Sequence, residues 1–229
     1  MSDPYTLTLA EKIDPAHTVL VIIDYQNDYM AEGGAFGRTG SDVGMMQAIE
    51  PALAAIIAAA RGAGILVIFV KSVYSTPDNR FLSRAFLHQA RRTRGGLYHE
   101  VPALQPDSWG GEFYGRVRPE PGDRVVVKHR FSAFVDTELP LLLRSKAIQT
   151  IVATGVATQT CVESTVRDAF FRDYFCVVPR ECVAAYRVDW HDDALARINR
   201  LFGEVADLQD VLDVWATASR ASRVTRVPA

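Results

Sequence analysis

The chain has 229 residues, of which 48% are hydrophobic and 23% are charged, and its formal net charge at pH 7 is −2. This size and composition suit one α/β domain with a sizeable core, and the small charge gives no general attraction to nucleic acid or anionic membranes. No apolar run approaches the roughly 20 residues of a membrane span, and no signal-peptide pattern opens the chain. Three cysteines are an odd, sparse set, which favours a reducing cytoplasm over a disulfide scaffold.

Apolar strands and amphipathic helices alternate along the chain. Six strands are expected, at residues 18–23, 65–70, 124–127, 150–153, 174–178 and 204–206. Helices are expected at about 51–62, 81–92, 139–143, 161–170, 189–201 and 211–215. The alternation predicts a single doubly wound, Rossmann-like α/β domain whose mostly parallel six-stranded sheet carries helices on both faces.

No repeat or break in composition divides the chain, so we expect one domain over residues 1–229 with a core at about 15–216. Residues 72–122 form an irregular insertion, and long excursions of this kind often shape a site or a subunit contact. Residues 219–229 carry three arginines and are expected to be a frayed tail rather than an arm that reaches a neighbouring subunit.

Cys161 is the most informative residue of the sequence. It follows an apolar strand and a glycine turn, where a helical pattern begins. A helix N-terminus favours thiolate over thiol, so this cysteine is a candidate nucleophile. A lone cysteine is more often an inert core residue, and Cys176, between Phe175 and Val177, fits that interpretation.

Two further reactive side chains, Asp24 and Lys128, also fall at the carboxyl ends of expected strands. Sites in open parallel sheets form outside those ends. A carboxylate there can take the thiol proton while the sulfur attacks a carbonyl, and can then pass it to the leaving nitrogen. A lysine ammonium beside both would hold Asp24 ionised and stabilise a thiolate. The combination indicates nucleophilic catalysis more strongly than any one residue does.

Three segments carry a resemblance to a known family. They read LVIIDYQND at 20–28, KHRFSAF at 128–134 and TGVATQTCV at 154–162. With the elements between them, over roughly residues 15–210, the chain resembles the isochorismatase-like cysteine hydrolases.

That resemblance implies a catalytic triad of Asp24, Lys128 and Cys161. It also implies a cis peptide between Val156 and Ala157, which would turn the Ala157 N–H toward the site. Together with the N–H of Cys161, this group would form an oxyanion hole.

Departures of this sequence from patterns within the family reduce the number of reactions that the resemblance allows. Members that hydrolyse isochorismate lack the nucleophilic cysteine, so Cys161 argues against that chemistry. The nicotinamidase branch carries a metal site with an Asp-x-His-type motif after the second strand, but residues 71–78 contain no histidine. The five histidines, which lack ligand spacing, are His17, His88, His99, His129 and His191. We therefore expect no metal and no cofactor.

The helix that starts at Cys161 and the Gly33-Gly34 turn resemble the ureidoacrylate amidohydrolase and biuret hydrolase branches. These enzymes cleave a C–N bond in a small carbamoyl or ureido compound. The glycine-rich stretch at 33–37 matches neither a phosphate-binding loop nor a dinucleotide fingerprint, so a dinucleotide dehydrogenase is not expected.

Residues near the strand ends and in loops over them are candidates for binding the substrate. They are Asn27, Tyr29, Phe36, Trp109, Phe134, Gln159, Thr160 and Tyr186. The two amides could pair with a urea-like group, and the aromatic rings could form apolar walls, although ordinary packing is an equal alternative for each ring. Arg80, Arg91, Arg92 and Arg94 could bind a substrate carboxylate, but a solvated face or a subunit contact is the commoner role.

The sequence thus predicts a cofactor-independent cysteine amidohydrolase, a hydrolase of C–N bonds other than peptide bonds. Its partners would be water and a small amide or ureido substrate, cleaved through a thioester-type intermediate, with no nucleic acid and no membrane. The alternatives are a nicotinamidase-like aromatic amide hydrolase and a non-catalytic small-molecule binding protein. A homo-oligomer, dimer or tetramer, is expected from the resemblance alone.

Overall fold

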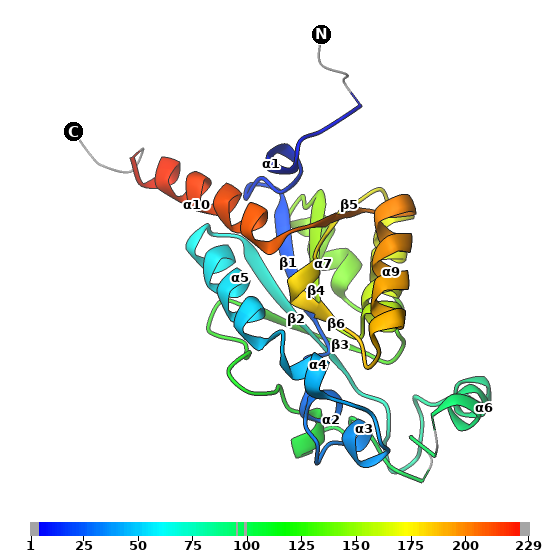
Figure 1. Ribbon diagram of the computed structural model, residues 1–229. Helices are drawn as coiled ribbons and strands as arrows, with labels where there is room; N and C mark the ends of the chain where they lie inside the picture. Colours follow the sequence, from blue (N-terminus) through cyan, green and yellow to red (C-terminus); the bar gives the residue numbers. More distant parts are fainter. Residues whose placement is uncertain (1–4, 95, 99, 225–229) are drawn as a thin grey trace.

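In the computed structural model, which describes residues 5–94, 96–98 and 100–224, the chain forms one seven-stranded sheet between helices (Figure 1). The strands are β1 (Thr18–Ile23), β2 (Leu66–Ser72), β3 (Arg124–Lys128), β4 (Thr150–Val156), β5 (Phe175–Pro179), β6 (Val183–Ala184) and β7 (Glu204–Ala206). The main path runs β3-β2-β1-β4-β5-β7, β6 pairs with β4, and every pairing of these strands is parallel. The predicted α/β fold class is confirmed. The strand count of six was wrong, because two residues are too few to show a periodic pattern.

The central strands are apolar and buried on both faces. In β1, Val19, Val21 and Ile23 belong to one core, whereas Leu20 and Ile22 belong to the other. Successive side chains of a strand point to opposite faces, so an uninterrupted apolar run is what a sheet covered on both sides requires.

Helices cover the two faces separately. The first face is covered by α5 (Glu50–Gly62) and α10 (Leu208–Val224), and the second by α7 (Leu139–Ser145), α8 (Glu163–Phe170) and α9 (Val188–Leu201). Figure 1 shows α5 and α9 on opposite sides of the sheet. Among the described helices, none combines the length and the apolar character that a membrane crossing requires.

The C-terminal helix is longer than expected. The prediction of a frayed tail from residue 219 was wrong up to Val224, because α10 continues to that residue. The stretch 208–224 contains neither glycine nor proline, so nothing in its sequence ends the helix early. The rest of the expected tail, 225–229, lies outside the described residues.

Four short helices have only four residues each. Three of them follow β1 and lie near the carboxyl ends of the strands: α2 (Asn27–Met30), α3 (Ala35–Arg38) and α4 (Gly44–Gln47). The fourth, α1 (Leu9–Lys12), precedes β1 and lies at the opposite end of the sheet (Figure 1). The segment between β2 and β3 carries α6 (Arg84–Thr93) and the turn η1 (Trp109–Gly111). The helix expected at 81–92 begins later, because the Ser83 hydroxyl accepts a hydrogen bond from the Phe86 N–H and so caps α6.

A glycine sets the spacing of the two middle strands. Gly155 in β4 pairs with Ile23 in β1, and its φ is +98°. A Cβ atom added to Gly155 would lie 2.1 Å from the backbone oxygen of Ile23. Any side chain there would force the ends of β1 and β4 apart.

Candidate active site

The three reactive side chains singled out in the sequence meet in one buried cluster. The Lys128 ammonium lies 2.7 Å from Oδ2 of Asp24 and 3.4 Å from the Cys161 sulfur. Asp24 and Lys128 are fully buried, and Cys161 is 3% exposed. Their proximity agrees with the expectation, while their catalytic roles stay a proposal.

Strand order and register explain this meeting. β3, β2, β1 and β4 are consecutive neighbours in the sheet, so their carboxyl ends lie along one edge. Lys128 ends β3, and Asp24 follows the last residue of β1 with a φ of 57°, which is uncommon for a residue other than glycine. The Asp24 N–H donates to the Val70 carbonyl at 2.9 Å, which fixes this turn against β2.

Ser72 is a fourth member of the cluster that the sequence reasoning missed. Its hydroxyl donates to Oδ1 of Asp24 at 2.9 Å and accepts from the Lys128 ammonium at 2.8 Å. Its backbone is held by Gln26, whose side chain exchanges two hydrogen bonds with it at 2.7 and 3.0 Å. The available signal was its place at the end of β2, between the strands of Asp24 and Lys128.

The cysteine sits inside a tight turn rather than at the first residue of a helix. The turn η2 (Thr158–Val162) is a π-helical turn, and α8 begins immediately after it. The Val156–Ala157 peptide before it is cis, as the resemblance implied. The Ala157 carbonyl accepts from the Thr160 and Val162 N–H groups at 3.0 and 3.3 Å.

The electrostatics of the cluster favour a neutral thiol. Burial raises the pKa of Cys161 to about 12, and although the Lys128 charge acts to lower it, Asp24 adds to the increase through its charge and a hydrogen bond. Burial alone would lower the pKa of Lys128, but Asp24 and Cys161 outweigh it and the net direction is upward. This increase in the pKa of the thiol is opposite to the decrease expected from a helix N-terminus. At neutral pH the sulfur keeps its proton until a base removes it.

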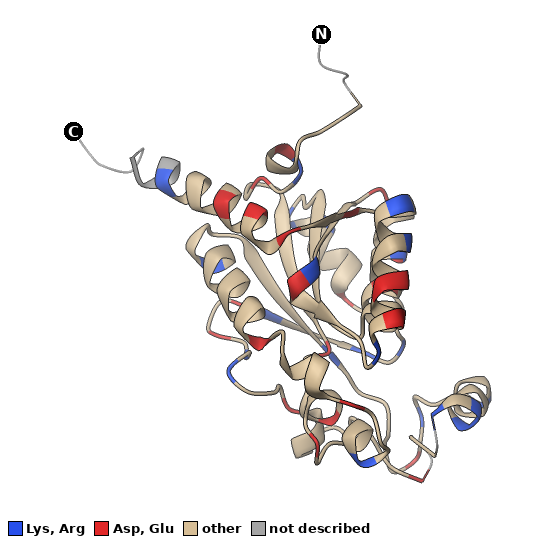
Figure 2. Ribbon diagram, in the orientation of Figure 1, with Lys and Arg blue, Asp and Glu red and all other residues tan. Residues whose placement is uncertain are grey.

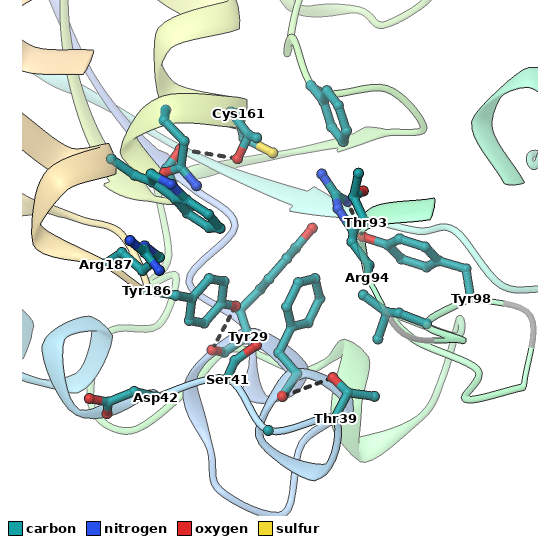
Figure 3. A pocket seen from close by; sticks show the side chains of 18 of the residues that line it. Tyr29, Thr39, Ser41, Asp42, Thr93, Arg94, Tyr98, Cys161, Tyr186 and Arg187 are labelled. Carbon is teal, nitrogen blue, oxygen red and sulfur yellow. Dashed lines mark hydrogen bonds between the residues drawn. The ribbon is translucent and has the colours of Figure 1, made fainter. Parts of the chain in front are cut away.

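A cavity of about 750 Å³ opens beside the sulfur, and Cys161 and Ala157 are among the residues that line it (Figure 3). Of the residues predicted to bind substrate, those that line it are Tyr29, Phe36, Gln159, Thr160 and Tyr186. The Phe36 and Tyr186 rings stack with centroids 5.3 Å apart, and Tyr29 packs against Phe36 at 4.8 Å. One wall of the cavity is therefore aromatic.

Three of the predicted residues do not line this cavity. The Asn27 side chain is buried and donates to the Trp109 carbonyl at 2.6 Å, so its amide holds a turn. The Trp109 ring is 58% exposed. Phe134 packs in the core on the second face, 6.1 Å from the ring of Tyr174. Nearness to a strand end does not determine the direction of a side chain, which explains these misses.

The excursion between β2 and β3 supplies lining residues that were given less weight or missed. Arg94, Leu97 and Tyr98 come from this segment, and Phe131 follows β3. Arg94 had been considered as a carboxylate ligand, but with a surface role as the commoner alternative. Long-range placement of this kind has no local sequence signal.

Histidines take part in contacts outside the cluster. Nδ1 of His129 lies 2.7 Å from the Val73 carbonyl oxygen, and its ring stacks on Phe81 with centroids 3.6 Å apart. His191 pairs with the Thr158 hydroxyl at 3.0 Å. His99 lies outside the described residues. Within the described ranges, no group of three or more His, Cys, Asp or Glu side chains could hold a metal ion.

Known proteins are similar to this chain over most of its length. The family model "Isochorismatase domain" matches residues 18–210. A ureidoacrylate amidohydrolase, RutB, from Enterobacter sp. strain 638 is 33% identical over 226 residues, which cover 95% of this chain and 96% of that enzyme. A second RutB, from Methylobacterium radiotolerans, is 35% identical over 219 residues, covering 91% of this chain and 83% of that one.

Among solved structures, a cysteine hydrolase from Pseudomonas syringae pv. phaseolicola superposes with a TM-score of 0.79. The superposition covers 95% of this chain and all of that one, at 23% identity. This likeness supports the fold.

Proposed function

This chain belongs to the isochorismatase family and is a hydrolase of C–N bonds other than peptide bonds, and from that premise we propose that it is a cysteine amidohydrolase of a small carbamoyl or ureido compound. The observation that carries the proposal is the contact of Lys128 with both Asp24 and Cys161. The cavity beside this sulfur, of about 750 Å³, is large enough for such a molecule.

Asp24 is the general base of the proposed reaction. It takes the proton of the Cys161 thiol while the sulfur forms a bond to the substrate carbonyl carbon, and the carbonyl oxygen becomes an oxyanion. The resting thiol is neutral, so proton removal and attack belong to the same step. Lys128, whose pKa is raised, stays charged and compensates the negative charge, which passes in this step from the Asp24 carboxylate to the substrate oxygen.

The oxyanion is stabilised by the backbone N–H groups of Ala157 and Cys161. Both residues line the cavity. Its collapse breaks the C–N bond, and protonated Asp24 gives its proton to the leaving nitrogen, which departs as ammonia or an amine. Asp24 then activates a water molecule. The water adds to the thioester-type carbonyl, the C–S bond breaks, and the proton returns to the sulfur.

Replacement of the nucleophile tests this mechanism directly. Ammonia or amine release is measured with ureidoacrylate, biuret, N-carbamoyl amino acids and nicotinamide. We expect Cys161→Ala to abolish turnover and Cys161→Ser to reduce it nearly to background. Cys176→Ala, which changes a buried cysteine of the core on the second face, is the matched control and should keep activity. Full turnover by Cys161→Ala would refute the mechanism, and nicotinamide as the sole substrate would favour the aromatic amide alternative.

A further inference from the structure

We propose that Arg94 binds a carboxylate of the substrate and thereby selects ureido acids over neutral ureas. This inference rests on the proposed function and adds the chemical class of its substrate. It comes from the position of Arg94 in the cavity and from what its guanidinium does and does not contact.

Arg94 faces the same cavity as the nucleophile. It is the C-cap residue of α6, in the middle part of the excursion between β2 and β3, and it is half-buried. In Figure 3, Arg94, Thr93 and Tyr98 lie on the right side of the cavity, and Arg187 and Asp42 lie on the left. Cys161 lies at the top of the view, between the two sides. A small molecule attacked by the sulfur would therefore have Arg94 at one end.

Aromatic groups hold the guanidinium. Its Nη1 donates to the Tyr98 hydroxyl at 3.3 Å, and its Cζ lies 5.1 Å from the centroid of the Phe131 ring and 6.0 Å from that of Tyr98. These contacts orient the planar group and compensate part of its desolvation. They do not neutralise its charge.

The other arginines of the cavity differ in this respect. Arg197 forms two hydrogen bonds of 3.0 Å with the Glu163 carboxylate, and Arg187 pairs with Asp189 at 2.8 Å. In the part of the chain that the structure describes, no ion pair includes Arg94. A cation that is held half-buried in an aromatic setting without an anion is costly unless a ligand supplies one.

The basic character is local to this side. α6 contains Arg84, Arg91 and Arg92 and no acidic residue, whereas α9 carries both signs (Figure 2). Asp42, the acidic residue labelled in Figure 3, lies on the opposite side of the cavity, and its side chain accepts from the Gly44 N–H at 2.9 Å. A bidentate guanidinium–carboxylate pair fits these conditions better than any neutral group does.

The aromatic wall of the cavity constrains the rest of the substrate. Tyr29, Phe36 and Tyr186 pack together beside the sulfur, so the part of the substrate between its two polar ends is expected to be short and apolar. The ligand class is thus a ureido or carbamoyl group joined to a carboxylate by a few carbon atoms.

The test compares two primary ureas of similar shape, 3-ureidopropionate and the uncharged isopentylurea. The variants are Arg94→Met, Arg94→Lys and, as the matched control, Arg91→Met, which changes an exposed arginine of the same helix. We expect Arg94→Met to lower kcat/KM for 3-ureidopropionate by about 100-fold, and at least tenfold more than for isopentylurea. Arg94→Lys should retain part of the preference, and Arg91→Met all of it. Equal losses on the two ureas, or a wild-type preference for isopentylurea, would overturn the inference.

A binding measurement separates this inference from the proposed function. In the Cys161→Ala background, calorimetry follows 3-ureidopropionate with Arg94 intact and with Arg94→Met. Binding that depends on Arg94 supports the carboxylate site even if the wild-type enzyme releases no ammonia or amine from these ureas or from the substrate panel above, a result that would refute only the proposed function. No binding, or binding that Arg94→Met leaves unchanged, would refute the carboxylate site.

Discussion

Replacing Ser72 by alanine should weaken both the fold and the reaction. The serine hydroxyl lies between the two charges of the cluster, 2.9 Å from Oδ1 of Asp24 and 2.8 Å from the Lys128 ammonium. The substitution removes one donor to a buried carboxylate and one acceptor from a buried ammonium. A hydrogen bond to a charged group contributes about 1.5–3 kcal/mol to stability.

The two charges keep other partners, which sets the size of the effect. Lys128 still contacts Asp24 at 2.7 Å and the Arg130 carbonyl at 3.0 Å. We therefore expect a loss of about 2 kcal/mol in the free energy of unfolding, nearer to one such bond than to two. Because Asp24 is the proposed base, kcat/KM should fall by about 10- to 100-fold.

Urea unfolding and ammonia release measure the two effects. Ser75→Ala is the matched control, because the Ser75 hydroxyl is also buried but accepts from the Ala103 N–H, away from the charges. It should cost about 1 kcal/mol in stability with little change in kcat/KM. If Ser72→Ala kept the wild-type kcat/KM, Ser72 would have no part in aligning the base.

Four further tests address other parts of the structure. Lys128→Met leaves the Asp24 carboxylate buried without its cation, so it should lower the free energy of unfolding, measured in urea, by about 3–5 kcal/mol. Adding Asp24→Asn to this variant should recover stability but not turnover. Recovery of turnover would contradict the proposed role of Asp24 as the base. Burial raises the pKa of Cys176 from 9.0 to about 12, so the native state keeps a proton that the unfolded chain loses above pH 9, and stability should fall with rising pH by about 1.4 kcal/mol per pH unit for this thiol. Cys176→Ala should make the free energy of unfolding, measured by denaturant titration, fall less steeply between about pH 8 and 10.5. An unchanged slope would show that this thiol ionises alike in the folded and unfolded states. Glu163→Gln weakens the ion pairs to Arg167 and Arg197 and should lower the melting temperature by a few degrees; no shift would mean that these pairs contribute nothing measurable. Incubation with EDTA followed by dialysis should leave kcat unchanged, and a loss that only a divalent metal restores would contradict the metal-free mechanism.

The sheet and the charged cluster were accessible from sequence for a physical reason. β1 and β4 are buried on both faces, so apolar residues dominate β1 after its first residue and β4 at 151–153. Parallel strands bring their carboxyl ends to one edge. Asp24, Lys128 and Cys161 could therefore be expected to meet although they are distant along the chain. Four-residue helices such as α2 and the two-residue β6 are too short to produce a period.

The lining of the cavity was less accessible, because it depends on side-chain direction and on a long excursion. Trp109 and Phe134 were expected at the site from their sequence positions, yet one ring is exposed and the other belongs to a core. Tyr98 and Arg94 line the cavity although they belong to the middle part of the long segment between β2 and β3. The direction of the Cys161 pKa was missed for a related reason, since the sequence shows a helix start but not the burial that raises it.

The proton that Cys161 retains at rest bears on oxidative damage. Peroxides react with a thiolate far faster than with a thiol, and a sulfenic acid formed in this way can proceed to irreversible products. With a pKa of about 12, almost none of the resting sulfur is ionised at neutral pH. In the proposed mechanism the sulfur becomes nucleophilic only when a bound carbonyl lets Asp24 take its proton. The same burial that delays activation should then protect the idle enzyme from oxidants.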